Sequence, residues 1–331
     1  MSEQSQGLRL KFEVAIALRQ ELLRANTICR ILDGSAEQVP NIRIDKLGTC
    51  LLIHIRADSL IEAENQIRLL VTEAEWLCLA LQCQVCVARI HLPSARDSAE
   101  LSAHVLWGEC PEVIELSEGT MRFFIKPLEA VNAGIFVDTR DIREYLRTHS
   151  FGKRVLNLFC YTGLLGLAAS VGKAAEVVQV DVSKRVLAWA KENWQLNAET
   201  GAGPTRFICE DSSAFLDKEA RRVARGKQGY DIVIIDPPAY GAAGKGGFSL
   251  LRDLPTLVAG IMKVLGPNGE LLLMCNLREL SSARLADIVS DAASKSGRDL
   301  VSCVELMAPA TDFRASSLQA SSMRGVQAKL A

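Results

Sequence analysis

The stretch that most constrains the fold is VLNLFCYTGLLGLAA at residues 155–169. A short apolar run of β-forming residues leads into a turn, and small and apolar residues at helical spacing follow it. The pattern predicts a strand, a tight turn and a helix. Ligands of an open parallel sheet bind beyond the carboxyl ends of the strands, where the strand order reverses, so we expect a cofactor at Tyr161 to Gly163.

The turn is not typical of a dinucleotide site. A G-x-G-x-x-G fingerprint brings backbone amides against a pyrophosphate, whereas only Gly163 and Gly166 are present here. Gly163 still permits a close approach of the backbone to a ligand. The sequence therefore disfavours a phosphate cradle.

Two later segments also end on acids. The apolar run at 175–180 is followed by Asp181, which we expect to bind the ribose hydroxyls of a nucleoside. The run at 206–209 is followed by Glu210 and Asp211, and we favour Asp211 for an adenine amine. Strands that end on acids and alternate with helices fit a nucleoside cofactor without phosphates, and S-adenosylmethionine is such a molecule.

Residues 130–240 resemble the catalytic domain of class I methyltransferases, in the branch with the bacterial large-subunit rRNA cytosine-5 methyltransferases of the RlmI type. The segments NAGIFVDTRDIREYL, LNLFCYTG, VVQVD and DIVIIDPPAY follow in the order and spacing of that family. Upstream, RILDGSAEQVPNIRIDKLG and LWGECPEVIELSEGTMRFFIKP resemble its middle domain. The resemblance covers roughly residues 10–331 and implies an α/β protein. We expect a smaller α+β domain at 1–128 and a seven-stranded, Rossmann-like class I methyltransferase domain at 129–331.

The resemblance also implies the cofactor and its contacts. S-adenosylmethionine is expected as the cofactor, with Asp138 and Arg140 supporting its methionine end. The residues expected to surround it are Asn157, Phe159, Tyr161, Gly163, Asp181 and Asp211.

The chain departs from the family in three places. Members usually begin with an RNA-binding domain of the PUA type, and only about ten residues precede the first helical segment here. The strand after the DPP motif reads LLLMCNLREL, and Cys275 lies at or one residue from the family's nucleophile. APATDFRASS stands where the family has a His-Pro pair. The nucleophile and the substrate pocket therefore follow the family pattern only in part.

The DPPAY motif predicts the substrate site. Asp236 ends a buried strand, and Pro237 and Pro238 hold the chain extended, so that carbonyls and Tyr240 can frame an extruded base. Cytosine 5 methylation needs a thiolate on carbon 6, which Cys275 would supply while Asp236 assists at nitrogen 3. Two alternatives stay open: methylation of a base amine without a covalent intermediate, and a non-catalytic, cofactor-binding RNA-assembly factor.

Composition bounds the partners. A net charge of −1 argues against a strongly basic RNA binder, so contacts with RNA, and rRNA in particular, must be local. No apolar run approaches the ~18 residues of a membrane span, so we expect a cytoplasmic protein without membrane contact.

The small domain is expected to bind RNA or to form the surface of a homodimer. Cys78, Cys83 and Cys86 match an iron-sulfur pattern only in part, so we expect buried cysteines and no metal. The glycine-rich segment 241–252 is expected to be a substrate loop.

Overall fold

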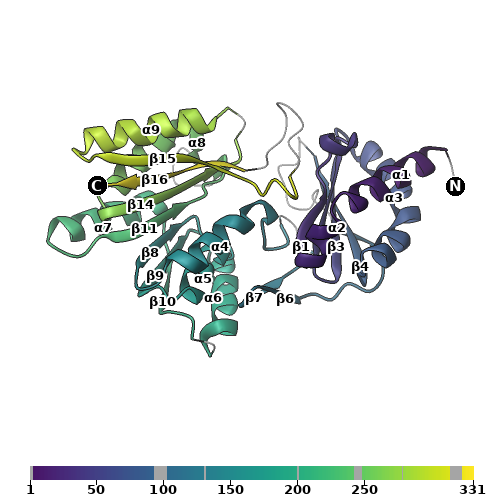
Figure 1. Cartoon of the computed structure of the whole chain (residues 1–331), viewed down its shortest axis with the longest axis horizontal. Coiled ribbons are helices and arrows are strands. Elements are labelled where there is room, and N and C mark those ends of the chain that lie inside the picture. Colours follow the sequence, from purple (N-terminus) through teal and green to yellow (C-terminus); the bar gives the residue numbers. More distant parts are fainter. Residues whose placement is uncertain are drawn as a thin grey trace. The chain divides into compact units, whose positions relative to one another are not determined.

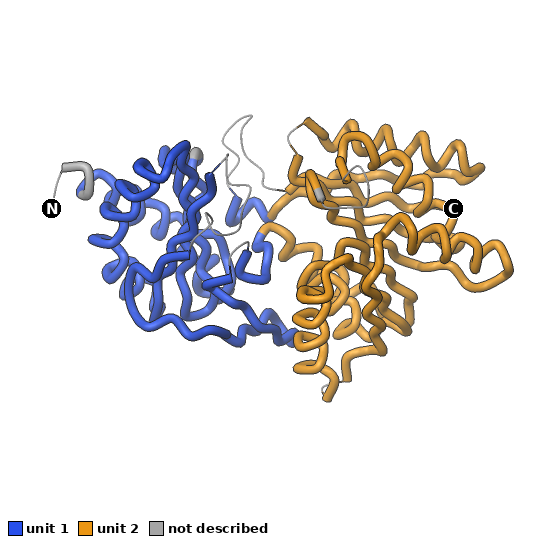
Figure 2. The backbone as a smooth tube through the Cα atoms, turned by 180° about the vertical axis from the view of Figure 1, so that it is seen from behind, with its two compact units in different colours: residues 1–137, 309–320 blue, residues 138–308, 321–331 orange. Residues whose placement is uncertain are grey.

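A computed structural model of the chain describes residues 3–92, 103–129, 132–199, 201–241, 248–277, 279–313 and 323–331. The chain divides into two compact units (Figure 2). The first unit comprises Met1–Val137 and Pro309–Ala320, and the second comprises Asp138–Ala308 and Ser321–Ala331. The boundary between residues 128 and 129 that the sequence predicts for the two domains stays a prediction. Residues 242–247 of the glycine-rich segment lie outside the described residues.

The first unit is an α+β structure around a five-stranded sheet of order β1-β2-β3-β4-β5 (Figure 1). Its strands β3 and β4 pair parallel, and the other pairs are antiparallel. A separate hairpin joins β6 to β7. The elements are α1 (Glu3–Ala17), α2 (Gln20–Ala25), β1 (Ile28–Leu32), η1 (Ser35–Glu37), β2 (Ile42–Leu47), β3 (Cys50–Arg56), α3 (Leu60–Ala80), β4 (Val85–His91), β5 (Ala103–Trp107), β6 (Ile114–Glu118) and β7 (Met121–Ile125).

One face of this sheet is covered by α1 and α3. Ser59 is the N-cap of α3, and its hydroxyl accepts a hydrogen bond from the amide of Glu62. The apolar side of α3 packs against side chains that point inward from β1 to β4. Cys78, Cys83 and Cys86 lie in this core, so the burial expected of them is confirmed.

The second unit contains a seven-stranded sheet of order β10-β9-β8-β11-β14-β16-β15, and its fold class is as predicted. All its neighbouring strands are parallel except β16, which is antiparallel to β14 and β15. The elements are η2 (Val137–Thr139), α4 (Arg140–His149), β8 (Arg154–Leu158), α5 (Leu164–Val171), β9 (Glu176–Asp181), α6 (Lys184–Ala198), β10 (Thr205–Cys209), α7 (Ser212–Ala224), β11 (Tyr230–Ile235), β12 (Tyr240–Gly241), β13 (Phe248–Ser249), α8 (Leu250–Met262), β14 (Leu265–Cys275), α9 (Ser282–Lys295), β15 (Leu300–Met307) and β16 (Arg324–Leu330).

Helices cover both faces of the seven-stranded sheet (Figure 1). Helices α7, α8 and α9 pack on one face, where Leu156 and Val178 belong to the main apolar core. Helices α4, α5 and α6 lie on the other face. Because central strands are buried on both faces, they read as nearly continuous apolar runs, which is why the sequence shows them clearly. Among the helices in the described ranges, none is long and apolar enough to cross a membrane.

Candidate active site

The centre of the second unit's sheet is a topological switch point. From β8 the chain continues to β9 and β10 on one side, and it later returns to place β11 on the other side. The segments that follow β8 and β11 therefore diverge at the same edge of the sheet. In parallel sheets this divergence opens the crevice in which cofactors bind.

The turn after β8 has an unusual backbone. Phe159 has φ 53° and Tyr161 has φ 50°, although neither is glycine. Gly163, with φ 77°, precedes helix α5 and donates its amide to the carbonyl of Cys160 at 2.8 Å. Left-handed conformations in bulky residues cost energy and cluster at ligand sites, so this turn has the features of a binding loop.

The buried side chains of Gln179 and Asn157 support this turn from the strands of the sheet. Nε2 of Gln179 donates to the carbonyl of Gly163 at 3.2 Å, and Nδ2 of Asn157 donates to Oε1 of Gln179 at 3.0 Å. On the helical side, Nδ2 of Asn193 donates to the carbonyl of Thr162 at 3.0 Å. Asn157 thus lies beneath the turn, and its predicted contact with the cofactor stays a prediction. Sequence reasoning missed Gln179 and Asn193, although an amide inside the apolar run VVQVD was the available signal.

Asp181 ties the turn to the end of β9. Its Oδ2 accepts the amide of Tyr161 at 3.0 Å, and its Oδ1 accepts the amide of Ser183 at 2.9 Å. Each carboxylate oxygen has a further lone pair, so both could still accept a ribose hydroxyl. The carboxylate is thus held at the end of β9 by two backbone amides, and its role in binding the ribose stays a prediction.

Asp211 stabilises the start of helix α7. It is the N-cap of α7, and its Oδ1 accepts the amides of Ser213 and Ala214, both at 3.0 Å. Its second oxygen is the atom that could meet an adenine amine. That role stays a prediction.

The aromatic residues of the turn pack outward from it. The ring of Phe159 is tilted against that of Phe248, with centroids 5.4 Å apart, and Tyr161 lies 6.3 Å from Trp189. Arg140 is the first residue of α4 and lies 3.8 Å from the carboxylate of Asp141. These contacts leave the predicted cofactor roles of Phe159, Tyr161 and Arg140 open.

Asp236 directly follows β11 on the other side of the crevice. Removal of solvent around its carboxyl, and then the nearby carboxylate of Asp138, raise the pKa of Asp236 to about 7. Pro237 is buried, whereas Pro238 and Tyr240 are exposed. Tyr240 begins the short strand β12, which pairs with β13. The motif therefore presents an acid that changes charge near neutral pH beside an exposed aromatic ring.

Cys275 is the last residue of β14, next to β11 in the sheet. Its side chain is almost completely buried, and its sulfur accepts the amide of Leu277 at 3.2 Å. Burial raises the pKa of the Cys275 thiol, the Leu277 amide partly offsets this, and the charge of Asp236 raises it further. Cys275 and Asp236 thus lie within electrostatic reach of each other, and the thiol is protonated at neutral pH.

The strand order and the antiparallel β16 define a class I methyltransferase fold. A family model described as S-adenosylmethionine-dependent methyltransferase matches residues 37–311, and the chain belongs to this family. The cofactor is S-adenosylmethionine, as the sequence predicted.

Curated relatives carry ribosomal RNA methyltransferase names. The chain is 34% identical over 165 residues to ribosomal RNA large subunit methyltransferase K/L of Hahella chejuensis, a match of 49% of this chain and 22% of the relative. It is 29% identical over 285 residues to ribosomal RNA large subunit methyltransferase I of Aeromonas hydrophila, covering 86% of this chain and 69% of the relative. The chain thus spans about a fifth of the K/L relatives.

Solved structures share the fold over nearly the whole chain. SMU.776, solved in complex with SAH, matches with a TM-score of 0.81 at 22% identity, covering 99% of this chain and 82% of that one. A SAM-dependent methyltransferase from Agrobacterium tumefaciens matches with a TM-score of 0.67 at 22% identity, covering 92% and 90%. At such identities the likeness supports the fold alone.

Proposed function

We propose that the protein transfers the methyl group of S-adenosylmethionine to a base of large-subunit ribosomal RNA. One observation carries the proposal: Asp181 and the Asp236–Pro237–Pro238 segment flank the strained turn after β8 from two sides of the switch point. The first could hold a nucleoside, and the second could hold a base opposite its methyl group. The names of the K/L and I relatives support RNA of the large subunit as the substrate.

Carbon 5 of cytosine is the first candidate for the target atom. The Cys275 thiolate would add to carbon 6, carbon 5 would attack the methyl group, and loss of the carbon 5 proton would expel the thiolate. With a pKa of about 7, Asp236 is often protonated at neutral pH and could donate a hydrogen bond to nitrogen 3. The position of Cys275 on the strand next to Asp236 supports this candidate.

A base amine is the second candidate, and the state of Cys275 favours it. The thiol is buried and has a raised pKa, whereas a nucleophilic cysteine needs an accessible thiolate. Transfer to an amine needs no thiolate. The ionised Asp236 and the carbonyls of the two prolines would accept the amine hydrogens and leave its lone pair directed at the methyl group.

Methyl transfer from labelled S-adenosylmethionine to rRNA from cells that lack the protein tests both candidates, with products mapped by mass spectrometry. The variants are Cys275→Ala and, as a matched control, Cys303→Ala on β15. Methylcytosine that disappears only with Cys275→Ala would support the covalent route. Methylation that survives both substitutions would support an amine. No methylation by the wild type would favour a cofactor-binding RNA-assembly factor.

A further inference from the structure

At one end of the five-stranded sheet of the first unit, polar side chains lie on the face opposite the main core. Alternate side chains of β3 enter the core, so His54 and Arg56 point to the other face. The strand register places Arg43 of β2 beside His54, and His91 of β4 beside Arg56. The register also places Arg89 of β4 beside His54, where it donates to the carbonyls of Pro127 and Glu129. Three neighbouring strands thus bring three arginines and two histidines together.

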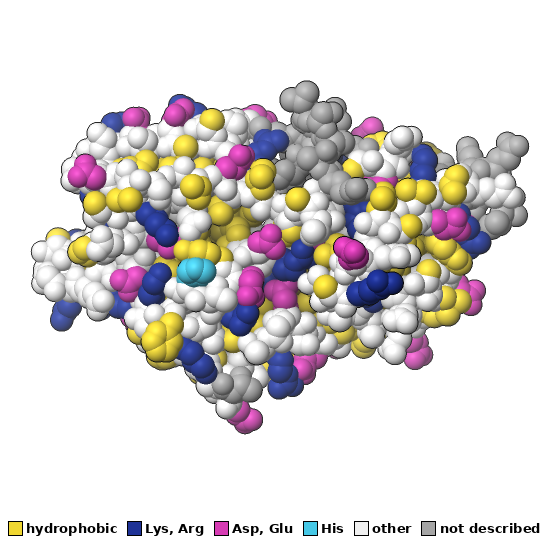
Figure 3. Space-filling model, viewed as in Figure 1, with side chains coloured by type: hydrophobic (Ala, Val, Ile, Leu, Met, Phe, Trp, Pro, Cys, Tyr) yellow, Lys and Arg dark blue, Asp and Glu magenta, His cyan; other side chains and the backbone are white. Residues whose placement is uncertain are grey.

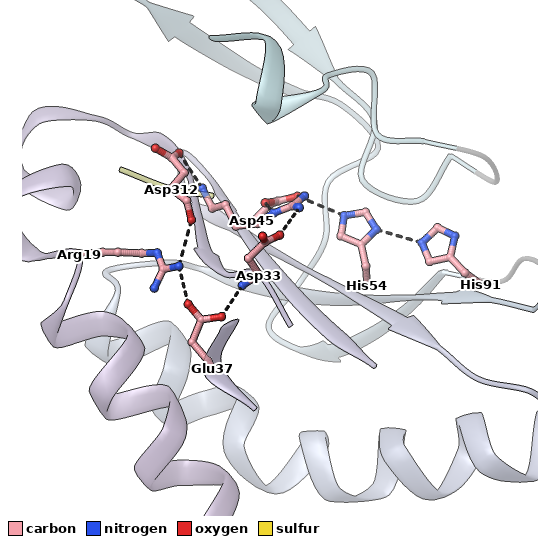
Figure 4. A network of polar contacts seen from close by, with 8 residues as sticks. Arg19, Asp33, Glu37, Asp45, His54, His91 and Asp312 are labelled. Carbon is pink, nitrogen blue, oxygen red and sulfur yellow. Dashed lines mark hydrogen bonds and ion pairs between the residues drawn. The ribbon is translucent and has the colours of Figure 1, made fainter. Parts of the chain in front are cut away.

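The carboxylates on this face are already bound. Arg30 donates to both oxygens of Asp45, at 2.8 and 3.0 Å, and to Asp33 at 3.0 Å. Asp45 also lies 3.3 Å from Nε2 of His54 (Figure 4). Burial alone would raise the pKa of Asp45, but the charge of Arg30 and the hydrogen bond of His54 hold it below its ordinary value. Asp45 is therefore ionised, and its charge is balanced by Arg30.

The two histidines add no charge at neutral pH. Nδ1 of His54 lies 3.0 Å from Nε2 of His91 (Figure 4). Because the ionised Asp45 favours a proton on Nε2 of His54, we assign Nδ1 of His54 as the acceptor and His91 as the donor. Burial, then His54 and the nearby arginines, lower the pKa of His91 to about 4, and burial also lowers that of His54. The charge of this face is therefore set by its arginines and carboxylates.

Arg43 and Arg56 carry the positive charge that is left over. Within the described ranges, neither guanidinium has a hydrogen bond or an ion pair. Asp33 attracts Arg43 but is hydrogen-bonded to Arg30. Burial, and then the charge of Arg30, lower the pKa of Arg43, and Arg56 adds to the repulsion. A half-buried cation beside other cations is unfavourable, and an entering anion would relieve it.

We propose that Arg43 and Arg56 bind a phosphate group of the RNA backbone. The inference rests on the proposed function, which makes RNA the substrate. A guanidinium presents a planar fork of N–H donors that matches phosphate oxygens, and the strand register brings two of them to the same face as diagonal neighbours. Figure 3 shows charges of both signs interspersed on the viewed surface, in agreement with the net charge of −1. Without a broad basic surface, RNA affinity depends on local sites such as this one.

The test is binding of transcribed large-subunit rRNA by the full chain, measured by filter binding at several KCl concentrations. The variants are Arg43→Gln, Arg56→Gln and the double variant. Each single substitution is expected to weaken binding about tenfold at low salt, and the double variant is expected to reduce the slope of log K against log salt by about one, because the site neutralises one phosphate. Arg43→Lys and Arg56→Lys should keep the slope but lose part of the affinity, because they keep the charge and lose the fork.

Arg122→Gln is the matched control. Arg122 lies in the same unit, but its charge is already paired with Glu115 at 2.7 Å, so RNA binding should not change. A double variant that folds, by its circular dichroism spectrum, and binds rRNA with the affinity and salt slope of Arg122→Gln would overturn the proposal. Wild-type binding that depends on both arginines without any methyl transfer would refute the proposed function and leave the phosphate site standing. Methyl transfer with unaltered binding by the double variant would refute the phosphate site alone.

Discussion

The two units differ in where they place charged side chains. In the second unit, acids lie at the ends of strands and bind backbone amides close by, as Asp181 does with Tyr161 and Ser183. In the first unit, charged groups lie within strands and pair with each other between neighbouring strands, as Arg30 does with Asp45. A polar group at a strand end can serve a ligand, whereas one inside a strand needs an internal partner. The comparison predicts that substitutions of charged residues in the first unit mainly lower its stability, whereas substitutions of the strand-end acids in the second unit mainly weaken ligand binding.

The largest effect is expected from breaking the ion pair of the first unit. Asp45→Ala leaves Arg30 buried without its main partner, which should lower the free energy of opening of this unit by about 3–5 kcal/mol. Hydrogen exchange of the β2 and β3 amides measures this locally. The double variant Arg30→Met with Asp45→Leu removes both charges and should be more stable than Asp45→Ala. A double variant as unstable as the single one would show that the pair is not the cause.

This contrast also explains what the sequence could predict. The central strands of the second unit are apolar on both faces, so their ends, and with them Asp181 and Asp236, stand out in the sequence. The polar network of the first unit could not be predicted, because its members lie far apart in sequence, from Arg19 to Asp312. Such contacts join segments that are distant along the chain, and no local sequence pattern shows them.

A smaller loss of stability is expected from Gly163→Ala in the turn after β8. The added Cβ would lie 2.7 Å from Nε2 of Gln179 and 2.8 Å from Cβ of Ala190, at a φ of +77°. Strain and overpacking together should lower the free energy of unfolding by about 2–4 kcal/mol, and S-adenosylmethionine binding should weaken. Gly226→Ala is the control, since its φ is +82° but nothing lies within 4 Å. It should cost only about 1 kcal/mol. Equal losses in both variants would contradict a packed, supported turn.

Asp181→Ala tests the strand-end acid itself. Loss of charge-assisted hydrogen bonds worth about 1.5–3 kcal/mol should weaken S-adenosylmethionine binding about 10- to 100-fold in calorimetry. Asp231→Ala is the counterpart at the other end of the sheet, because Asp231 accepts the amide of Arg154 at 2.7 Å near the start of β11. It should lower stability but leave the affinity for S-adenosylmethionine unchanged. Unchanged affinity in Asp181→Ala would refute the ribose assignment.

The smallest predicted effect, about tenfold in rate per pH unit, concerns Asp236. An amine target needs the carboxylate, so kcat/KM should rise with pH to about 7, the pKa of Asp236, and then level off. Cytosine 5 methylation needs neutral Asp236 and ionised Cys275. Between about pH 7 and the raised pKa of the thiol, a rise in pH lowers the fraction of neutral Asp236 as much as it raises the fraction of ionised Cys275. The pH profile of kcat/KM for this route therefore also levels off.

Asp236→Asn separates the two routes. With a neutral amide in place of the carboxyl, the covalent route retains only its need for the thiolate, so kcat/KM should keep rising about tenfold per pH unit through neutral pH. The amine route loses its titrating group, and its residual kcat/KM should be independent of pH over the same range. Stopped assays of rRNA methylation from about pH 6 to 8.5, around the pKa of Asp236, measure the difference. A break near pH 7 that persists in Asp236→Asn would mean that a group other than Asp236 titrates at the site, so that this strand-end acid does not serve the reacting base.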